Sequence, residues 1–380
     1  MIDLFGNRAN EKYTYRRVYW PTLEEGPELG NVISGWVELS AFSDLKATCN
    51  FTFEGGEAPN QNDLVRIYYS FDDDYGEHAE FCIGTFFIGY SGLTNVADYE
   101  LNECTGLRIS GTADGWSTLK VLQDITLGYR YTVHAGDMPV QVAIQKIRET
   151  GLKVNVASES SYTLSGDHTF EPSDTLLTAV NWLLTTAGYQ APYVSSEGIV
   201  QISRYVDPSD RDVQAVFKND ENSIMYPEVQ EQSDWQTTPN VYKLDYSDDT
   251  IALHAEARNL SGSKASLDAR GNRELSVSET VMELAGEDAS EMKSKLEEMT
   301  TNRLLDVSAG IEHVSLSHPY IPLVANDAVT IQYAEKTWSG SVQNIHIDLS
   351  TATRCDTTIR KFVPVSINVV ASSAIDWESS

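Results

Sequence analysis

Positive charge is scarce in this sequence. It has 27 Lys and Arg residues against 56 Asp and Glu residues, which gives a formal net charge of −29 at pH 7. Such a surface repels phosphates, so we expect no nucleic-acid binding through a basic patch and no attraction to anionic membranes. An acidic balance commonly serves solubility. It would also suit a lumen through which DNA passes without binding. Composition alone does not decide between solubility and such a lumen.

Paired cysteines and long apolar runs are also missing. The four cysteines, Cys49, Cys82, Cys104 and Cys355, contain no C-x-x-C pair. A structural zinc site is therefore unsupported, and free thiols in a reducing cytoplasm fit better. No apolar run is long enough to cross a membrane, and residues 1–17 are polar and charged. We expect neither a membrane-spanning segment nor a signal peptide of the usual form.

The common catalytic motifs are absent as well. The sequence has no phosphate-binding loop, no dinucleotide fingerprint and no H-E-x-x-H. Gly89-Tyr90-Ser91-Gly92 comes nearest to a nucleophile elbow but lacks the G-x-S-x-G spacing. With 56 acidic residues, no glycosidase carboxylate pair can be singled out. We therefore predict a protein that is not an enzyme, and we name no catalytic residue and no cofactor.

One partial motif resembles the start of a calcium loop. Asp72, Asp74 and Gly76 have the D-x-D-x-G spacing that can bring carboxylates to one hard cation. Ile83 stands where the distal glutamate of such a loop belongs. A solvated hairpin tip is therefore the preferred interpretation.

Three histidines could hold zinc if they converged. His313 and His318 lie five residues apart, and His346 could approach them across a sheet. Pro319 ends any regular element after His318, and the spacing is loose. We expect ordinary packing or surface histidines, and we predict no metal site.

Aromatic residues are abundant. Tyrosine occurs 19 times and tryptophan 7 times, and the hydrophobic fraction of 41% is enough to build real cores. Tyr13, Tyr15, Tyr19 and Trp20 form a cluster within residues 1–30, a segment predicted to be an arm packed on the body or on a neighbour. The cluster could stack on sugars or dock on another subunit, and the sequence leaves both open.

Residues 31–130 are predicted to form short antiparallel strands. Residues 47–53 alternate with period two, and residues 64–71 and 81–90 are further strands joined by an acidic turn. Tyr99–Leu107 and Tyr129–Val133 add two more strand candidates. Many short strands with close turn signals are typical of a small barrel or sandwich.

The spacing of apolar residues changes from strand alternation to helical stripes in residues 131–206, which are predicted to form an α/β insertion. A helix is expected from an N-cap at Asp137 to a left-handed glycine at Gly151. A second helix opens at residues 172–174 and closes at Gly188. The apolar stripes of the two helices are Val140, Ala143, Ile144 and Ile147, and Leu176, Leu177, Val180, Leu183 and Leu184.

The remainder is predicted to be mixed. Residues 207–280 are interpreted as connecting strands with an exposed loop at 259–274, and residues 281–365 as a long helix followed by antiparallel strands. The helix spans Glu287 to Leu305, and its apolar face is Ala289, Met292, Leu296 and Met299. Residues 366–380 are expected to be a tail. The fold class is multi-domain α+β.

The order of these segments resembles phage tail hub proteins, the subunits that join a tail tube to the central spike or fibre. Three stretches carry the resemblance. The first runs from residues 63–69 to C-I-G-T-F-F-I-G-Y at 82–90. The second is the insertion, from 140–151 through 170–177 and 183–189 to E-G-I-V at 197–200. The third is the final helix, which is followed by 317–323, 326–329 and 340–349.

The resemblance implies two tube-type antiparallel β-barrels with an α/β insertion, assembled as a homotrimer that matches a hexameric tube. It further implies partners among the tube or distal tail proteins and the spike or tip proteins, an acidic lumen for passing DNA, and a place in the virion tail. At 380 residues we expect no C-terminal peptidase, lysozyme or receptor-binding domain. A tail-tip hydrolase acting on cell-wall peptide or glycan and a carbohydrate-binding receptor module stay open as alternatives.

Overall fold

The fold was analysed in a computed structural model of the 380-residue chain. It describes residues 8–30, 32–54, 63–73, 75–100, 103–158, 160–164, 166–206, 210–220, 225–247, 251–281, 284, 289–309, 312–350, 353–362 and 366–373. The chain divides into two compact units. Unit 1 contains Met1–Glu228, Leu316–Thr337 and Val342–Thr358, and unit 2 contains Val229–Ser315, Trp338–Ser341 and Ile359–Ser380.

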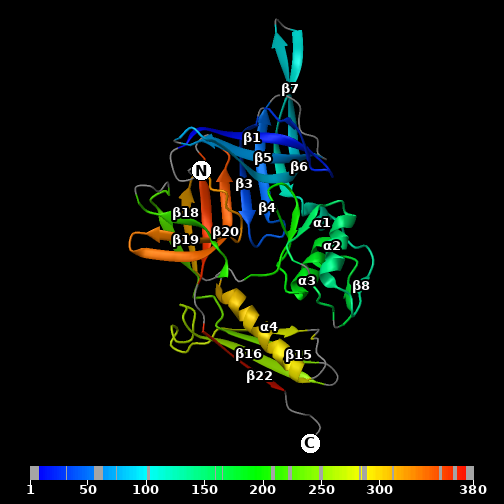
Figure 1. The fold of residues 1–380 in the computed structure, drawn as a ribbon, viewed down its shortest axis with the longest axis vertical. Coiled ribbons are helices and arrows are strands. Elements are labelled where there is room, and N and C mark those ends of the chain that lie inside the picture. Colours follow the sequence, from blue (N-terminus) through cyan, green and yellow to red (C-terminus); the bar gives the residue numbers. More distant parts are fainter. Residues whose placement is uncertain are drawn as a thin grey trace, which may run out of the picture. The chain divides into compact units, whose positions relative to one another are not determined.

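Unit 1 is built on an antiparallel sheet (Figure 1). Its neighbouring strands follow the order β20-β3-β4-β7-β6-β5-β1-β2. Their bounds are β1 Ala9–Tyr19, β2 Glu24–Glu28, β3 Val32–Ser40, β4 Ala47–Glu54, β5 Leu64–Asp72, β6 His78–Glu100, β7 Glu103–Ser117 and β20 Lys336–Asp348. The predicted alternation of β4 is confirmed, because Cys49, Phe51 and Phe53 are all buried.

The segment predicted as an N-terminal arm contributes β1 and β2 to this sheet. β1 pairs along its length with β5, for example Thr14 with Tyr68 and Arg16 with Arg66. Tyr15 and Val18 point into the core and are buried. The polar residues between them kept the alternation weak in the sequence, although the strand lies between β5 and β2 in the sheet.

The α/β insertion forms a compact body within unit 1. Its elements are α1 Lys120–Asp124, β8 Tyr131–Val133, α2 Pro139–Glu149, β9 Val154–Val156, β10 His168–Phe170, α3 Leu176–Thr186, β11 Tyr193–Val194 and β12 Val200–Ile202. β12 pairs in parallel with β9 and antiparallel with β11, while β8 pairs with β10. Both predicted apolar stripes are buried in one core.

The helix ends of the insertion differ in part from the prediction. Gly151 and Gly188 have φ of +85° and +76°, as expected for residues that end helices. Asp137, however, does not cap α2: Met138 occupies the N-cap position, and the Asp137 carboxylate accepts instead from the backbone N–H of His134. Thr175 caps α3, and its hydroxyl accepts from the N–H of Thr178 at 3.1 Å.

Three strands belong to both units. They are β18 Glu312–His318, β20 and β21 Cys355–Lys361, and their hydrogen-bonded order is β18-β21-β20. In unit 1, β13 Val213–Lys218 also pairs in parallel with β19 Ala328–Tyr333. In unit 2, β14 Val229–Ser233 adds to the edge of β18.

Unit 2 has a separate four-stranded sheet in the order β17-β15-β16-β22, with the helix α4 packed on it (Figure 1). The bounds are β15 Val241–Ser247, β16 Ala252–Ser261, β17 Ser276–Val281, α4 Ala289–Ala309 and β22 Ser366–Ser373. Residues 366–373 were expected to be tail. They instead complete this sheet, because Ala371 packs into its core with Ile367 and Val369 beside it.

The predicted long helix is present as α4, but its amphipathic stripe is only partly realised. Leu296 is buried and Met292 and Met299 are partly buried against the sheet. Thr300 is also buried, and its hydroxyl donates to the Leu296 carbonyl at 2.6 Å. That internal bond lets a polar residue sit on the buried face.

The loop at 259–274 is only in part the exposed loop that its small polar residues predict, since Lys264, Asp268 and Ala269 are exposed but its centre is not. Ala265, Ser266 and Leu267 are buried, and backbone bonds tie the loop to β16, such as Leu267 N–H to the Asn259 carbonyl at 2.9 Å. Asn259 is fully buried and its amide donates to the Ser263 hydroxyl. Side-chain amides and hydroxyls thus supply the contacts that apolar residues usually provide.

The fold class predicted from the sequence is confirmed as a β-rich α+β fold. Over the residues that the structure covers, the sheets end in edge strands and do not close into the two barrels that the resemblance implies. Among those same residues, no helix is both long and apolar enough to cross a membrane.

Candidate functional site

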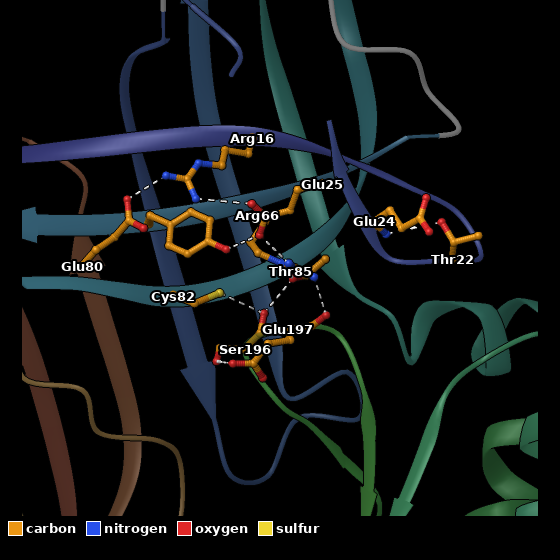
Figure 2. A network of polar contacts seen from close by, with 11 residues as sticks. Arg16, Thr22, Glu24, Glu25, Arg66, Glu80, Cys82, Thr85, Ser196 and Glu197 are labelled. Atoms are coloured by element: carbon orange, nitrogen blue, oxygen red, sulfur yellow. Dashed lines mark hydrogen bonds and ion pairs between the residues drawn. The ribbon is translucent and has the colours of Figure 1, made fainter. Parts of the chain in front are cut away.

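A polar network of unit 1 joins the insertion to the sheet (Figure 2). The turn between β11 and β12, residues 195–198, reaches the face of β5 and β6. The turn is closed by the N–H of Gly198, which donates to the Ser195 carbonyl at 2.9 Å. This junction is where two bodies of different secondary structure meet.

Arg66 of β5 lies at the centre of the network. It is only 6% exposed, and each of its three nitrogens has a partner. Nε donates to the Thr85 hydroxyl at 2.9 Å, one terminal nitrogen to Glu25 Oε1 at 2.6 Å, and the other to the Glu197 carbonyl at 2.8 Å. One side chain therefore holds β2, β6 and the insertion turn together.

Glu25 of β2 is the matching acceptor. Besides Arg66, it accepts from the Tyr68 hydroxyl and from Arg16, the latter at 3.3 Å. Arg16 also pairs with Glu80 at 2.8 Å and lies over the Tyr68 ring. Burial alone would raise the pKa of Glu25, but the bonds from Tyr68 and Arg66 outweigh it and hold that pKa below its usual value.

The insertion turn is held at close range. The Thr85 hydroxyl donates to the Ser196 carbonyl at 2.7 Å, the Cys82 thiol approaches the same carbonyl at 3.3 Å, and the Thr118 hydroxyl donates to the Gly198 carbonyl at 3.2 Å. Gly198 has φ of +88°, and a Cβ there would lie 3.2 Å from the Thr85 Cβ. Only glycine fits this approach without strain.

The chemistry of this network is structural. Its charges are paired and its principal donors are already engaged within the chain, so it fixes geometry and presents no group poised for proton transfer. In the sequence, Arg66 and Tyr68 alternate with the apolar residues Val65 and Ile67 of the same strand. A lone arginine between Val65 and Ile67 was the available signal for a buried ion pair, but nothing marked Glu25 as its partner.

A second feature of unit 1 is a long two-stranded ribbon. β6 pairs with β5 only as far as Phe87, and β7 pairs with β4 only from Ser110 onward. Beyond these points β6 and β7 pair with each other up to Glu100 and Glu103. Figure 1 shows this ribbon (cyan) running past the rest of the sheet. In the described residues the ribbon thus has two unpaired backbone edges.

The residues of the partial calcium motif do not form a cation site in what is described. Asp74 lies outside the described residues. Asp72 accepts from Asn10 at 2.7 Å and contacts the His78 ring at 2.8 Å. The buried Asp73 carboxylate accepts from the N–H groups of Tyr75 and Glu77 and so shapes the turn, at which Gly76 has φ of +75°.

The three histidines are not brought together as a set. His313 belongs to unit 2, while His318 and His346 belong to unit 1. His318 is buried, with Nδ1 donating to the Pro319 carbonyl at 2.6 Å and Nε2 accepting from the Thr357 hydroxyl at 2.8 Å. Both ring nitrogens are therefore engaged. Over the residues that were searched, no cluster of metal-ligating side chains occurs.

The other residues singled out in the sequence are structural. Gly89, Tyr90 and Gly92 lie within strand β6 beside a bulge, so no nucleophile elbow forms there. The aromatic cluster is dispersed: Tyr13 packs on Tyr69, Tyr15 on Phe51 and Trp20 on Phe87, while Tyr19 is exposed.

The cysteines whose side chains are described are free. Cys49 and Cys355 are buried, and burial raises the pKa of both thiols. Cys82 is half-buried, and burial raises its pKa to about 12. These thiols are therefore inert at neutral pH. The side chain of Cys104 lies outside the described residues.

Known structures share this fold along nearly the whole chain. A tail protein from Neisseria meningitidis MC58 superposes with a TM-score of 0.63 at 10% identity, over 92% of this chain and 97% of that one. The 43 kDa tail protein of prophage MuSo2 from Shewanella oneidensis gives 0.61 at 12% identity, over 91% and 98%. Prophage tail protein gp18 from Listeria monocytogenes EGD-e gives 0.51 at 11% identity, over 91% and 94%.

No family model and no curated protein sequence matches the chain. At these identities the comparisons establish the fold. The resemblance to phage tail proteins read from the order of segments is thus confirmed at the level of the fold, with both chains covered almost completely.

Proposed function

We propose that this chain is a structural subunit of a phage or prophage tail, a hub that joins the tail tube to the tail tip or spike. The observation that carries the proposal is the fold shared, over almost the full length of both chains, with three proteins described as tail proteins. Its place would be the virion tail, and its partners the tube or distal tail protein and the spike or tip protein.

The interior of the chain supports a role in assembly and not in catalysis. The polar network around Arg66 fixes the insertion to the sheet. The long ribbon of β6 and β7 has edges that a neighbouring chain would satisfy. No described observation favours the hydrolase or the carbohydrate-binding alternative.

The proposed assembly is a homotrimer. Two tube-type barrels per chain, closed only when strands of neighbouring subunits meet the open sheet edges, would then match a hexameric tube. The 56 acidic residues outnumber the 27 basic ones and would give the central lumen a negative charge. That charge would repel DNA, so that DNA passes without binding.

The test is particle size followed by shape. Size-exclusion chromatography with light scattering should give three times the chain mass of 42.2 kDa, and negative-stain microscopy should show a ring with a central hole. The measurement should be repeated with the cognate tube protein, because hubs can trimerise only during assembly. A chain that stays monomeric with and without the tube protein would refute the trimeric hub.

A further inference from the structure

The loop between β16 and β17 in unit 2 positions two arginines at one surface. The loop is anchored at its far end by Asn240, whose amide donates to the Arg273 carbonyl at 3.0 Å and whose side-chain oxygen accepts from the Leu275 N–H at 2.8 Å. Asn240 is fully buried. The backbone that carries Arg270 and Arg273 is therefore held firmly.

Arg270 has unused hydrogen-bonding capacity. Its Nε and one terminal nitrogen are inaccessible to solvent and have no hydrogen-bond partner among the described residues. Its guanidinium lies over the Trp235 ring, 5.9 Å from the centroid. A planar guanidinium held by an aromatic face keeps its N–H edge directed sideways for a ligand.

Arg273 adds a second positive charge nearby. Burial and the Arg273 charge both lower the pKa of Arg270. The two arginines line a cleft of about 430 Å³ together with Gln236, Glu274 and Leu275. The carboxylate in that cleft, Glu274, is engaged by Arg258 at 2.6 Å. Thus no described carboxylate of the cleft neutralises Arg270.

This arrangement is costly unless an anion completes it. The two guanidinium nitrogens that are shielded from solvent lose their hydration and gain no hydrogen bond in return. It is also unexpected in a chain with 56 acidic residues, where carboxylates are available in excess. A flat carboxylate matches the fork of N–H groups that a guanidinium presents.

We propose that the cleft of Arg270, Arg273 and Gln236 is a carboxylate-binding site. The Arg270 side chain would turn toward the cleft and bind the carboxylate through Nε and the terminal nitrogen that are shielded and unsatisfied without a ligand. Arg273 would supply the second charge, and the Gln236 amide would set orientation. The carboxylate comes either from a free organic acid or from an acidic side chain of a second copy of this chain.

The experiment uses malonate as the probe on the full chain. Thermal unfolding is followed in malonate and in sodium chloride of equal ionic strength, and malonate affinity is measured by calorimetry. Malonate should raise the midpoint above that in chloride. The variant R270Q/R273Q should bind malonate at least about tenfold more weakly, since each lost charged hydrogen bond is worth that much.

A matched control removes two other surface arginines. R130Q/R354Q deletes the same charge at positions that are 73% and 58% exposed and bonded to Glu171 and Asp356, so it should keep the malonate effect. Without malonate, R270Q/R273Q should be as stable as the wild type or more stable, because two shielded nitrogens without hydrogen-bond partners are removed. A large loss of stability in its absence would mark both arginines as purely structural and overturn the site.

Sedimentation velocity separates the two sources. If malonate dissociates an assembly of the wild type, the natural carboxylate belongs to a second copy; if the particle size is unchanged, the ligand is a free acid. A chain that is monomeric throughout would refute the trimeric hub and leave the malonate measurement intact. Equal stabilisation by malonate and chloride, or stabilisation by inorganic phosphate alone, would overturn the carboxylate site.

Discussion

Two arginines on neighbouring strands show how burial sets the contribution of an ion pair to stability. Arg66 and Arg16 both contact Glu25, but the side chain of Arg66 is 8% exposed and that of Arg16 is 29% exposed. Arg66 also satisfies a buried hydroxyl and a backbone carbonyl. The two side chains therefore form a matched pair for mutation.

Arg66→Ala should lower the free energy of unfolding by about 3 kcal/mol, because it leaves buried acceptors without a donor. Arg16→Ala should cost no more than about 1 kcal/mol, as expected for a solvated pair. Urea unfolding monitored by circular dichroism measures both. Similar costs for the two variants would show that the junction does not depend on Arg66.

His318 makes stability depend on pH. Burial lowers its pKa from 6.5 to about 4. Between pH 6.5 and 4 the unfolded chain takes up a proton that the folded chain refuses, so the contribution of His318 is complete above pH 6.5 and is lost as the pH falls toward 4. The loss should approach about 3 kcal/mol.

The measurement is the difference in unfolding free energy between wild type and His318→Gln across that range, which cancels the titration of carboxylates. The exposed His346, changed to Gln, serves as the control and should retain the wild-type slope. A His318→Gln profile parallel to that of the wild type would mean that the imidazole titrates normally in the folded chain.

At the scale of elements, α4 tests which face of a helix matters. Leu296 is fully buried, whereas Leu305 is 38% exposed. Leu296→Ala should destabilise unit 2 by about 3 kcal/mol through lost burial and a cavity. Leu305→Ala should cost less than about 1 kcal/mol. Comparable effects in urea unfolding would place Leu305 in the core of an assembled form.

Elements with a strong local period could be predicted from the sequence. The stripes at Val140–Ile147 and Leu176–Leu184 fixed the insertion helices, and the alternation at 47–53 fixed β4, because each pattern reports burial on one face. Elements held by polar contacts could not. The buried part of the loop at 259–274 is held through Asn259 and Ser263, and such side chains are also typical of exposed loops.

The junction and the ribbon escaped prediction for a different reason. The Arg66–Glu25 pair joins residues 41 positions apart, and no local pattern couples them. Strand β6 was predicted only at 81–90, because Gly89 and Gly92 interrupt its alternation. The candidate at 99–107 covers the end of β6 and the start of β7. In the structure those glycines lie at or near a bulge that the strand passes without ending.

At the scale of the whole molecule, the ribbon of β6 and β7 is the feature that a monomeric chain does not account for. An isolated two-stranded hairpin is marginally stable in water, and its exposed edges invite pairing. Gly92, Leu93, Thr94 and Asn95 are exposed along it. The acidic charge of −29 per chain opposes association, so an interface between copies needs backbone pairing to offset that repulsion.

Replacing residues 95–109 by Asn-Gly should separate folding from assembly. Thr94 pairs with Ser110, so a two-residue turn joins them in register. The chain should keep its unfolding midpoint within about 2 °C, because the deleted strands pair only with each other in the described residues. It should no longer form the ring, alone or with the tube protein. Rings of wild-type size from the shortened chain would show that the ribbon serves some other contact.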